Sequence, residues 1–422
     1  MIHAVDIQNN SLKTINVLIV FALFFAMEFS YTNSVIEVFG YMGFTVSSVS
    51  ILKKIFAYII ITLIIYIINF KLISVFAKII TQLIVIFLLF PAIIMFIHSN
   101  TDFQILAAHL LFFFTTFCFL KYVKFTFKVK SIEPSQKLSF LFFLTTLLII
   151  PFFITYKLNI SLSTFFLENI YETRATSAEL SNPYLGYVYS WLARILIPMS
   201  IVFSFFYRSK VRLILFLLFL SYLFLVSAHK SILFGSIVII FFYYIPKKYI
   251  LLSMSSGVIA LLLFGVILSY LYDNYFITSL ITRRVFFVPA LLDTYYFEFF
   301  NLKPLYWSGS FLSSFIDYPY NLDPPYLIGD YYFNKPNMSA NNGLISDGYS
   351  NFGWIGIVFN IVVLSFIFSF FNSLRISHRF YGLFIAFFFS IVSSYLPAVL
   401  LTHGGILLII VAQLFMKNTE QD

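Results

Sequence analysis

Long, continuous runs of apolar residues separated by short polar segments make up most of this 422-residue chain. Runs of about 17 to 22 residues have the length that a helix needs to cross the hydrocarbon core of a bilayer. Because the runs do not alternate between apolar and polar residues, they indicate membrane-spanning helices and not the strands of a barrel. We predict twelve spans, near residues 14–30, 54–70, 79–97, 103–120, 138–156, 185–206, 213–228, 231–245, 250–272, 351–373, 380–399 and 404–416. The runs at 213–228 and 404–416 are short, so a re-entrant hairpin or a ten-span protein is an open alternative.

Two longer polar segments, residues 157–184 and 273–350, interrupt this pattern. The longer segment holds six of the 13 prolines, ten tyrosines and seven carboxylates. A structureless loop of 78 residues would be unusual. We therefore expect short helices lying at the membrane surface, above all at 285–300, where aromatic residues crowd together.

The composition agrees with a membrane protein, since a chain that is 61% hydrophobic and 10% charged cannot bury its apolar surface in a soluble globule. We predict an all-α, polytopic integral membrane protein with a single membrane domain, 1–422. The single cysteine, Cys118, lies in an apolar run and argues against a disulfide framework or a cysteine metal site. The first apolar run lacks a small-residue cleavage site and is expected to be a retained anchor.

The distribution of charge predicts the orientation. A cytoplasmic N-terminus places 16 of the 26 lysines and arginines on the inside and both longer polar segments outside, in agreement with the positive-inside rule. Lys53 and Lys54 oppose this orientation. Membrane orientation explains most of the net charge of +9, so no nucleic-acid partner is needed. The short cytoplasmic links, without a glycine-rich phosphate loop, argue against a nucleotide-hydrolysing domain.

Three basic residues are candidates for binding an anion. Arg194 lies inside a predicted span, where a charge costs roughly 2.5–3.5 kcal/mol, and the alternative is a structural ion pair with a neighbouring span. Lys230 begins a span whose helix N-terminus faces outward, so an anion could be shared by the lysine and the helix, although lipid phosphate could serve equally. Arg174 lies in the shorter polar segment and would be unremarkable alone.

The longer polar segment contributes an adjacent pair of arginines, Arg283 and Arg284. Arginine side chains match phosphate oxygens two at a time, so the pair suits a diphosphate, and anchoring of a surface helix to lipid head groups is the competing explanation.

Asp347 precedes Gly348 in a predicted turn, directly before a span that Ser350 or Asn351 can cap. A carboxylate at this surface, tuned by partial burial and nearby arginines, can act as a general base, although Asp-Gly is also common in turns for backbone reasons. His403, in another outer turn, is a second candidate and is more often a structural residue in such a setting. The tyrosines of the loop could stack on sugars or form an interfacial aromatic belt.

The segment from Asn341 to Gly356, NNGLISDGYSNFGWIG, resembles the signature before a late span in bacterial O-antigen polymerases, the Wzy-type oligosaccharide repeat unit polymerases. Residues 283–290, RRVFFVPA, resemble a second segment of that family, and residues 171–174 and 227–231 resemble two weaker ones. The four matches occur in the family's order. His229 beside Lys230 departs from the family, in which small residues are commoner at this turn.

The resemblance implies a glycosyltransferase-C-like fold that acts at the periplasmic face of the bacterial inner membrane. A growing glycan would move from undecaprenyl diphosphate to a hydroxyl of a new lipid-linked repeat unit. Asp347 would activate the acceptor, and Arg283, Arg284, Lys230, Arg174 and Arg194 would neutralise the departing diphosphate. We expect no metal and no cofactor; a chain-length regulator and a flippase are the expected pathway partners.

Two other functions remain open. An O-antigen ligase performs the same chemistry on a lipid A core acceptor. A lipid-linked oligosaccharide flippase also has about twelve spans, but it would place its cations along a central cavity and would not need a large external loop.

Overall fold

The computed structural model describes residues 2–47, 49–99, 101–126, 131–157, 164, 170–180, 182–310, 312–417 and 419. Every regular element in these ranges is a helix, which confirms the predicted all-α class for the described part of the chain. Side chains are described in the same ranges except at residues 2–10, 170, 171, 178, 230, 231, 233 and 234.

Ten helical stretches among the described residues are long and apolar enough to cross a membrane. They are Ser11–Met42, Ile51–Lys71, Val75–His98, Phe103–Tyr122, Pro134–Tyr156, Pro183–Phe206, Lys210–Ser227, Lys247–Tyr272, Leu344–Ser373 and Leu396–Met416. Two shorter apolar helices, Gly235–Tyr244 and His378–Ser393, fall where two further spans are predicted. The protein therefore has the helices of a multi-pass membrane protein, and the count of twelve spans stays a prediction.

The chain divides into two compact units, each built from separate stretches of sequence. The first unit comprises residues 1–124, 246–369 and 392–395, and the second comprises 125–245, 370–391 and 396–422. Each unit is described by itself below, and the predicted single membrane domain stays a prediction.

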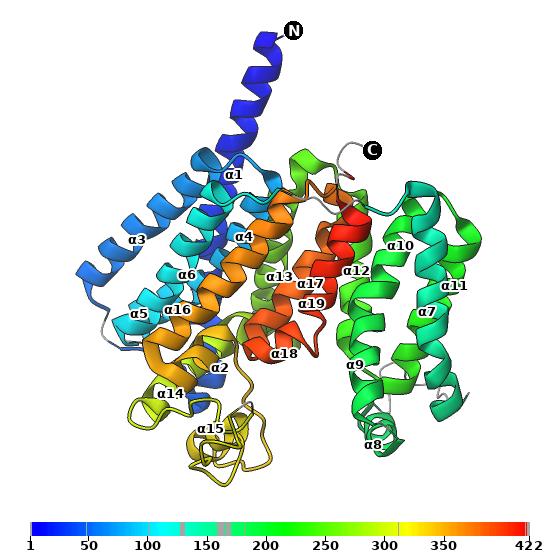
Figure 1. Ribbon diagram of the computed structural model, residues 1–422. Helices are drawn as coiled ribbons and strands as arrows, with labels where there is room; N and C mark the ends of the chain where they lie inside the picture. Colours follow the sequence, from blue (N-terminus) through cyan, green and yellow to red (C-terminus); the bar gives the residue numbers. More distant parts are fainter. Residues whose placement is uncertain are drawn as a thin grey trace. The chain divides into compact units, whose positions relative to one another are not determined.

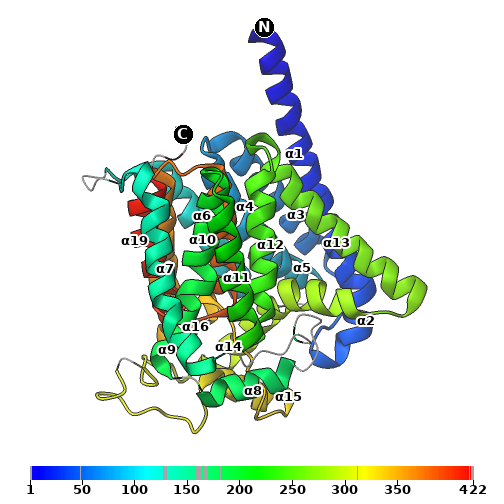
Figure 2. The same ribbon diagram turned by 90° about the vertical axis from the view of Figure 1, so that its right-hand side faces the viewer.

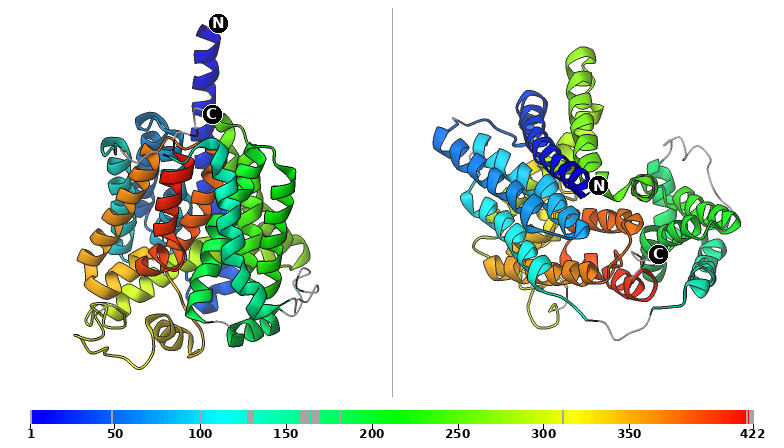
Figure 3. Two further views of the ribbon diagram at one scale, coloured as in Figure 1. Left: turned by 45° about the vertical axis from the view of Figure 1, so that its right-hand side comes forward. Right: turned by 90° about the horizontal axis from the view of Figure 1, so that it is seen from above.

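The first unit is built around a buried helical stretch. Its helices are α1 (Ile2–Ser30), α3 (Ile51–Tyr66), α4 (Val75–Ile84), α5 (Phe90–His98), α6 (Phe103–Tyr122) and α13 (Ile250–Tyr272). The whole apolar window of the stretch Val75–His98 is buried, so its all-round apolar surface is covered by protein. α1 packs along α13, as the views in Figures 1 and 3 illustrate.

The helix predicted at 285–300 is present and begins earlier than expected, whereas its place at the membrane surface stays a prediction. A π-helical stretch, η8 (Thr278–Phe287), continues directly into α14 (Val288–Phe300), and Figure 2 shows this helix lying crosswise to α13. A further short helix, α15 (Pro324–Phe333), follows. The segment has a small hydrophobic core of its own, formed by Leu292, Tyr296, Phe300, Leu305, Ile328 and Ala340. The polar segment is therefore an ordered layer at the end of the first unit.

Helix α16 (Leu344–Ser373) begins earlier than predicted and is sharply kinked. The backbone leaves the helical region at Phe352 and at Gly353, where φ is +59°. The two arms meet closely, because a Cβ atom on Gly348 would lie 2.6 Å from the carbonyl carbon of Gly356. The predicted turn at Asp347-Gly348 and the predicted cap at Ser350 or Asn351 are wrong, since all four residues are helical and precede the kink.

The second unit contains a group of neighbouring helices. They are α7 (Pro134–Tyr156), α9 (Pro183–Trp191), η6 (Leu192–Leu196), α10 (Ile197–Phe206), α11 (Lys210–Ser227), α12 (Lys230–Tyr244), α17 (Tyr381–Ser393, up to Ile391), α18 (Leu396–Leu400) and α19 (Gly405–Val411). The short helix α8 (Ile170–Leu180) contacts α7 and α11 and lies across their ends (Figure 2). The Tyr222 hydroxyl donates to the carbonyls of Phe152 and Lys157, at 3.0 and 2.8 Å, and links α11 to the end of α7.

Candidate functional site

Arg174, Arg194 and His229 form a basic group in the second unit. Arg174 lies on α8, and its Nε and Nη2 atoms donate to the carbonyl oxygen of Ala228 at 3.3 and 3.1 Å. Ala228 ends α11 in the left-handed conformation, so its carbonyl belongs to the partially negative end of that helix. This contact fixes Arg174 beside the α11–α12 turn that carries His229.

Arg194 lies in η6, within the apolar stretch Pro183–Phe206. Its Nη1 donates to the Ser390 hydroxyl at 3.2 Å, and its side chain is half-buried. None of the carboxylates that the structure describes lies within ion-pair distance of Arg174, Arg194 or His229. The structural ion pair considered for Arg194 is therefore not found in the described part of the chain, where its guanidinium is hydrogen-bonded to a neutral hydroxyl.

His229 is the third member of the basic group. Its ring lies 5.6 Å from that of Tyr189, whose hydroxyl is hydrogen-bonded to Ser227. Desolvation lowers the pKa of His229 below its ordinary value, and the charges of Arg174 and Arg194 lower it further. Both arginines therefore act electrostatically on His229. Lys230 follows as the first residue of α12, and its side chain lies outside the described residues.

The turn that carries His403 packs on the same helix as Arg194. Trp191 Nε1 donates to the carbonyl of Leu401 at 3.2 Å, and a Cβ atom on Gly404 would lie 2.5 Å from Ile195 Cδ1. Arg174, Arg194 and His403 are thus all found in the second unit, although they come from three separate parts of the sequence.

Arg283 and Arg284 lie in the first unit, and their side chains are not presented together. Arg283 is buried; its guanidinium lies 4.4 Å from the Phe39 ring centroid and donates to Met42 Sδ and Ser279 Oγ, both at 2.7 Å. Burial and the adjacent Arg284 lower the pKa of Arg283. Arg284 is exposed. Of the two arginines, Arg284 is therefore the one that could make the predicted bidentate contact with a diphosphate, and that role stays a prediction.

Asp347 lies in the short first arm of α16 and is half-buried. Its Oδ1 accepts a hydrogen bond from Asn351 Nδ2 at 3.0 Å, and its Oδ2 accepts one from Asn360 Nδ2 at 3.1 Å. Because Asn360 lies beyond the kink, this carboxylate ties the two arms together. The geometry suits a structural role as well as a catalytic one, and the role of general base stays a prediction.

A buried acid–imidazole pair, which we did not predict, lies directly behind this arm. Asp293 Oδ2 lies 3.1 Å from His109 Nε2, and both side chains are almost fully buried. Asp293 Oδ1 accepts from Asn342 Nδ2 at 2.9 Å and from Ser346 Oγ at 2.6 Å. The carboxylate therefore links α6 and α14 to the segment that carries Asp347.

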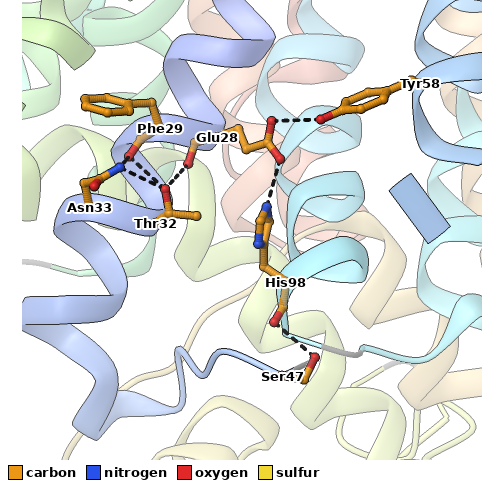
Figure 4. Close-up of polar contacts among 7 residues, drawn as sticks. All are labelled: Glu28, Phe29, Thr32, Asn33, Ser47, Tyr58 and His98. Atoms are coloured by element: carbon orange, nitrogen blue, oxygen red, sulfur yellow. Dashed lines mark hydrogen bonds and ion pairs between the residues drawn. The ribbon is translucent and has the colours of Figure 1, made fainter. Parts of the chain in front are cut away.

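A second such pair joins α1 to α5. His98 Nε2 lies 2.8 Å from Glu28 Oε1, and the Tyr58 hydroxyl donates to Glu28 Oε2 at 3.5 Å (Figure 4). The carbonyl of His98 accepts from the backbone N–H of Ser47 at 2.7 Å. This network holds the loop 43–47 against the ends of α1 and α5.

The loop 43–45, the start of α6 and one face of α14 enclose a pocket of about 940 Å³ in the first unit. This volume lies within the range of small-molecule sites, about 300–1,000 Å³. Three charged residues, Lys53, Asp102 and Glu298, line the pocket. Gly43, with φ at +104°, allows the Tyr295 hydroxyl to approach the loop and donate to the Met42 carbonyl at 3.2 Å.

Sequence reasoning missed these residues, although a signal for some of them was present. Glu28 and His109 are ionisable residues inside apolar runs, which are candidate functional positions by default. Lys53, which opposed the predicted orientation, lines the pocket and has its Nζ 4.8 Å from the Phe96 ring centroid. Comparisons with known protein families, with curated proteins and with solved structures find no match to this chain.

Proposed function

We propose that this protein is a membrane glycosyltransferase that polymerises undecaprenyl-diphosphate-linked oligosaccharide repeat units at the periplasmic face of the bacterial inner membrane. The proposal includes a glycosyltransferase-C-like fold. It draws on the resemblance of residues 341–356 and 283–290 to O-antigen polymerases and on the chemistry of the side chains described above.

The observation that carries the proposal is the basic group of the second unit. Arg174 is hydrogen-bonded beside the turn that carries His229, both arginines act electrostatically on His229, and no carboxylate in the described part of the chain pairs with these three residues. Arg194 lies within an apolar stretch, where a charge without an anionic partner is costly. A lipid-linked diphosphate would supply the missing negative charge, and arginine donors match its oxygens.

In the proposed reaction, a hydroxyl oxygen of the acceptor repeat unit attacks the anomeric carbon of the donor glycan. The new glycosidic bond forms as the bond from that carbon to the diphosphate oxygen breaks. The hydroxyl proton passes to Asp347, and undecaprenyl diphosphate leaves with the electron pair. Asp347 accepts hydrogen bonds from two amide donors, Asn351 and Asn360, which help to fix its position for this step.

Two related functions make different forecasts. A ligase would use the same donor with a lipid A core acceptor, and a flippase would carry the lipid-linked unit without changing a covalent bond.

The test is the surface-glycan ladder of cells that lack this protein. A polymerase predicts that single repeat units still reach the lipid A core and that longer chains disappear. Complete absence of attached units would contradict polymerisation and favour a ligase or a flippase. Restoration of the ladder by the wild-type gene serves as the control.

A further inference from the structure

The pocket of the first unit combines flat aromatic faces with hydrogen-bonding groups. Phe297 and Tyr349 stack with their ring centroids 3.8 Å apart and their planes 6° apart, and both line the pocket. Tyr295, also in the wall, stacks on Tyr332 at 4.1 Å. Phe297 and Tyr349 are themselves almost fully buried, so the lining rings that a ligand can reach are the exposed Phe103 and the half-buried Tyr295, whose faces can pack against the apolar C–H face of a sugar ring. The walls therefore suit a ring that is apolar on its faces and polar at its edge.

Polar groups around these rings supply both donors and acceptors. Asn301 Oδ1 accepts from the Tyr349 hydroxyl at 3.2 Å, while its amide N–H groups have no partner among the described residues. Glu298 Oε2 accepts from the Tyr332 hydroxyl at 3.2 Å, and its Oε1 has no described donor. An exposed amide donor and an exposed carboxylate acceptor thus border the same cavity.

The charge of the lining distinguishes one class of sugar from another. Two carboxylates, Asp102 and Glu298, face a single ammonium, that of Lys53. Lys53 already lies against the Phe96 ring, whereas Asp102 Oδ1 caps α6 by accepting from the backbone N–H of Gln104 at 2.9 Å. The pocket therefore presents an excess of negative charge, which repels a carboxylate on a ligand and attracts an ammonium.

We infer that this pocket binds a sugar residue and selects neutral or amine-bearing sugars over acidic ones, with Glu298 as the residue that sets the preference. The choice of a sugar rests on the proposed function; the charge preference rests on the lining of the pocket. Glu298 carries the preference because it is exposed at the cavity, so its charge reaches the ligand without a change in the fold.

Direct binding tests this inference. Glucose, glucosamine and glucuronate are titrated onto the full-length protein in lipid nanodiscs at about pH 6.5, where the amine and the carboxylate are both charged. Saturation-transfer NMR measures each dissociation constant. We expect glucosamine to bind most tightly and glucuronate least tightly. Glu298→Gln is expected to reduce the ratio of glucosamine affinity to glucuronate affinity roughly two- to fivefold, the size of an exposed charge interaction.

The matched control is Asp330→Asn, which removes an exposed carboxylate on α15 that is not part of the pocket lining. It should leave the ratio unchanged. Glucuronate binding as tightly as glucosamine, no binding of any of the three sugars, or an equal effect of the two variants would overturn the inference. Because free sugars are measured without chain extension, sugar binding by a protein that fails the glycan-ladder test would remove the proposed function and leave the charge preference standing.

Discussion

The acid–imidazole contacts of the first unit and the basic group of the second unit are held by different kinds of partner. In the first unit, the half-buried Glu28 and the buried Asp293 are each matched by an imidazole and by at least one further hydrogen-bond donor. In the second unit, Arg174 and Arg194 are matched by a carbonyl and a hydroxyl, and no described carboxylate pairs with them. In the first arrangement each carboxylate has hydrogen-bonding partners from the protein, whereas in the second the arginines have no carboxylate partner among the described residues. This difference makes the second unit the stronger candidate for an anionic ligand and the first for precise positioning.

The largest expected effect concerns Asp347. Asp347→Asn should slow chain extension by about 10²–10⁴-fold, the usual cost of removing a general base, because an amide cannot accept the proton of the acceptor. The glycan ladder of cells expressing the variant, at matched protein abundance, measures this loss. The Asn side chain is close in size to that of Asp and can still accept one hydrogen bond.

The competing forecast follows from the two contacts that tie Asp347 to the arms of α16. If the residue only holds the kink, Asp347→Asn keeps one of the two hydrogen bonds, so chain extension should fall by less than about tenfold, the cost of one hydrogen bond. Asn360→Ala removes one of these hydrogen bonds and keeps the carboxylate. A large loss of chain extension in Asp347→Asn with a small loss in Asn360→Ala indicates a general base, whereas similar losses in both variants indicate a structural role. A ladder of wild-type length from Asp347→Asn would return Asp347 to a structural role and make His403 the next candidate for the base.

The next effect tests how much the buried Asp293–His109 contact stabilises the first unit. Asp293→Ala leaves His109, Asn342 and Ser346 without their shared buried partner. Breaking such a pair should lower the free energy of unfolding by about 3–5 kcal/mol. Denaturant unfolding in detergent micelles measures the change, and Asp330→Ala, at an exposed position, is the control. A loss below about 1 kcal/mol would mean that the buried pair contributes no more than an ordinary hydrogen bond.

The smallest effect is a pH dependence in the second unit. The lowered pKa of His229 means that its imidazole resists protonation in the free protein. A bound anion favours the imidazolium, so binding should take up a proton, and affinity for a diphosphate should rise as the pH falls towards the pKa of the free protein. The gain is up to about tenfold for each unit by which binding raises the pKa.

The difference between wild type and His229→Gln isolates this effect, because titration of the ligand itself is common to both proteins. Titrations of a prenyl diphosphate between about pH 8 and pH 5.5 measure it across the ordinary pKa of histidine. Parallel pH profiles for the two proteins would show that His229 does not sense the anion.

The sequence was sufficient for the features that depend on local pattern. Apolar runs located the long helices, and crowded aromatic residues located the helix that the structure extends over Thr278–Phe300. The start of α16 could not be predicted in this way, because its polar first arm is stabilised by the close approach of Gly348 to Gly356. The pairing of His109 with Asp293, 184 residues apart, likewise depends on tertiary structure, since nothing local specifies it.

The grouping of Arg174, Arg194 and His403 within one unit was also beyond local pattern. We selected these residues individually from the sequence, because each is an ionisable residue in a predicted span or in a predicted outer segment. Their grouping depends on how α8, η6 and the turn before α19 pack, which residue periodicity does not specify.

The central claim is that the basic group of the second unit binds a lipid-linked diphosphate, and the affinity of this group for a prenyl diphosphate tests it most directly. Isothermal titration of farnesyl diphosphate into nanodisc-embedded protein compares wild type, Arg194→Ala and Arg212→Ala. Arg212 is the matched control because it also donates to a serine hydroxyl, that of Ser139, at 3.1 Å, and lies in the first turn of α11. We predict that Arg194→Ala weakens binding by about 10- to 100-fold, as expected for loss of a hydrogen bond to a charged group, while Arg212→Ala changes it less than about twofold. Equal affinities for wild type and Arg194→Ala, or equal losses in both variants, would contradict the claim.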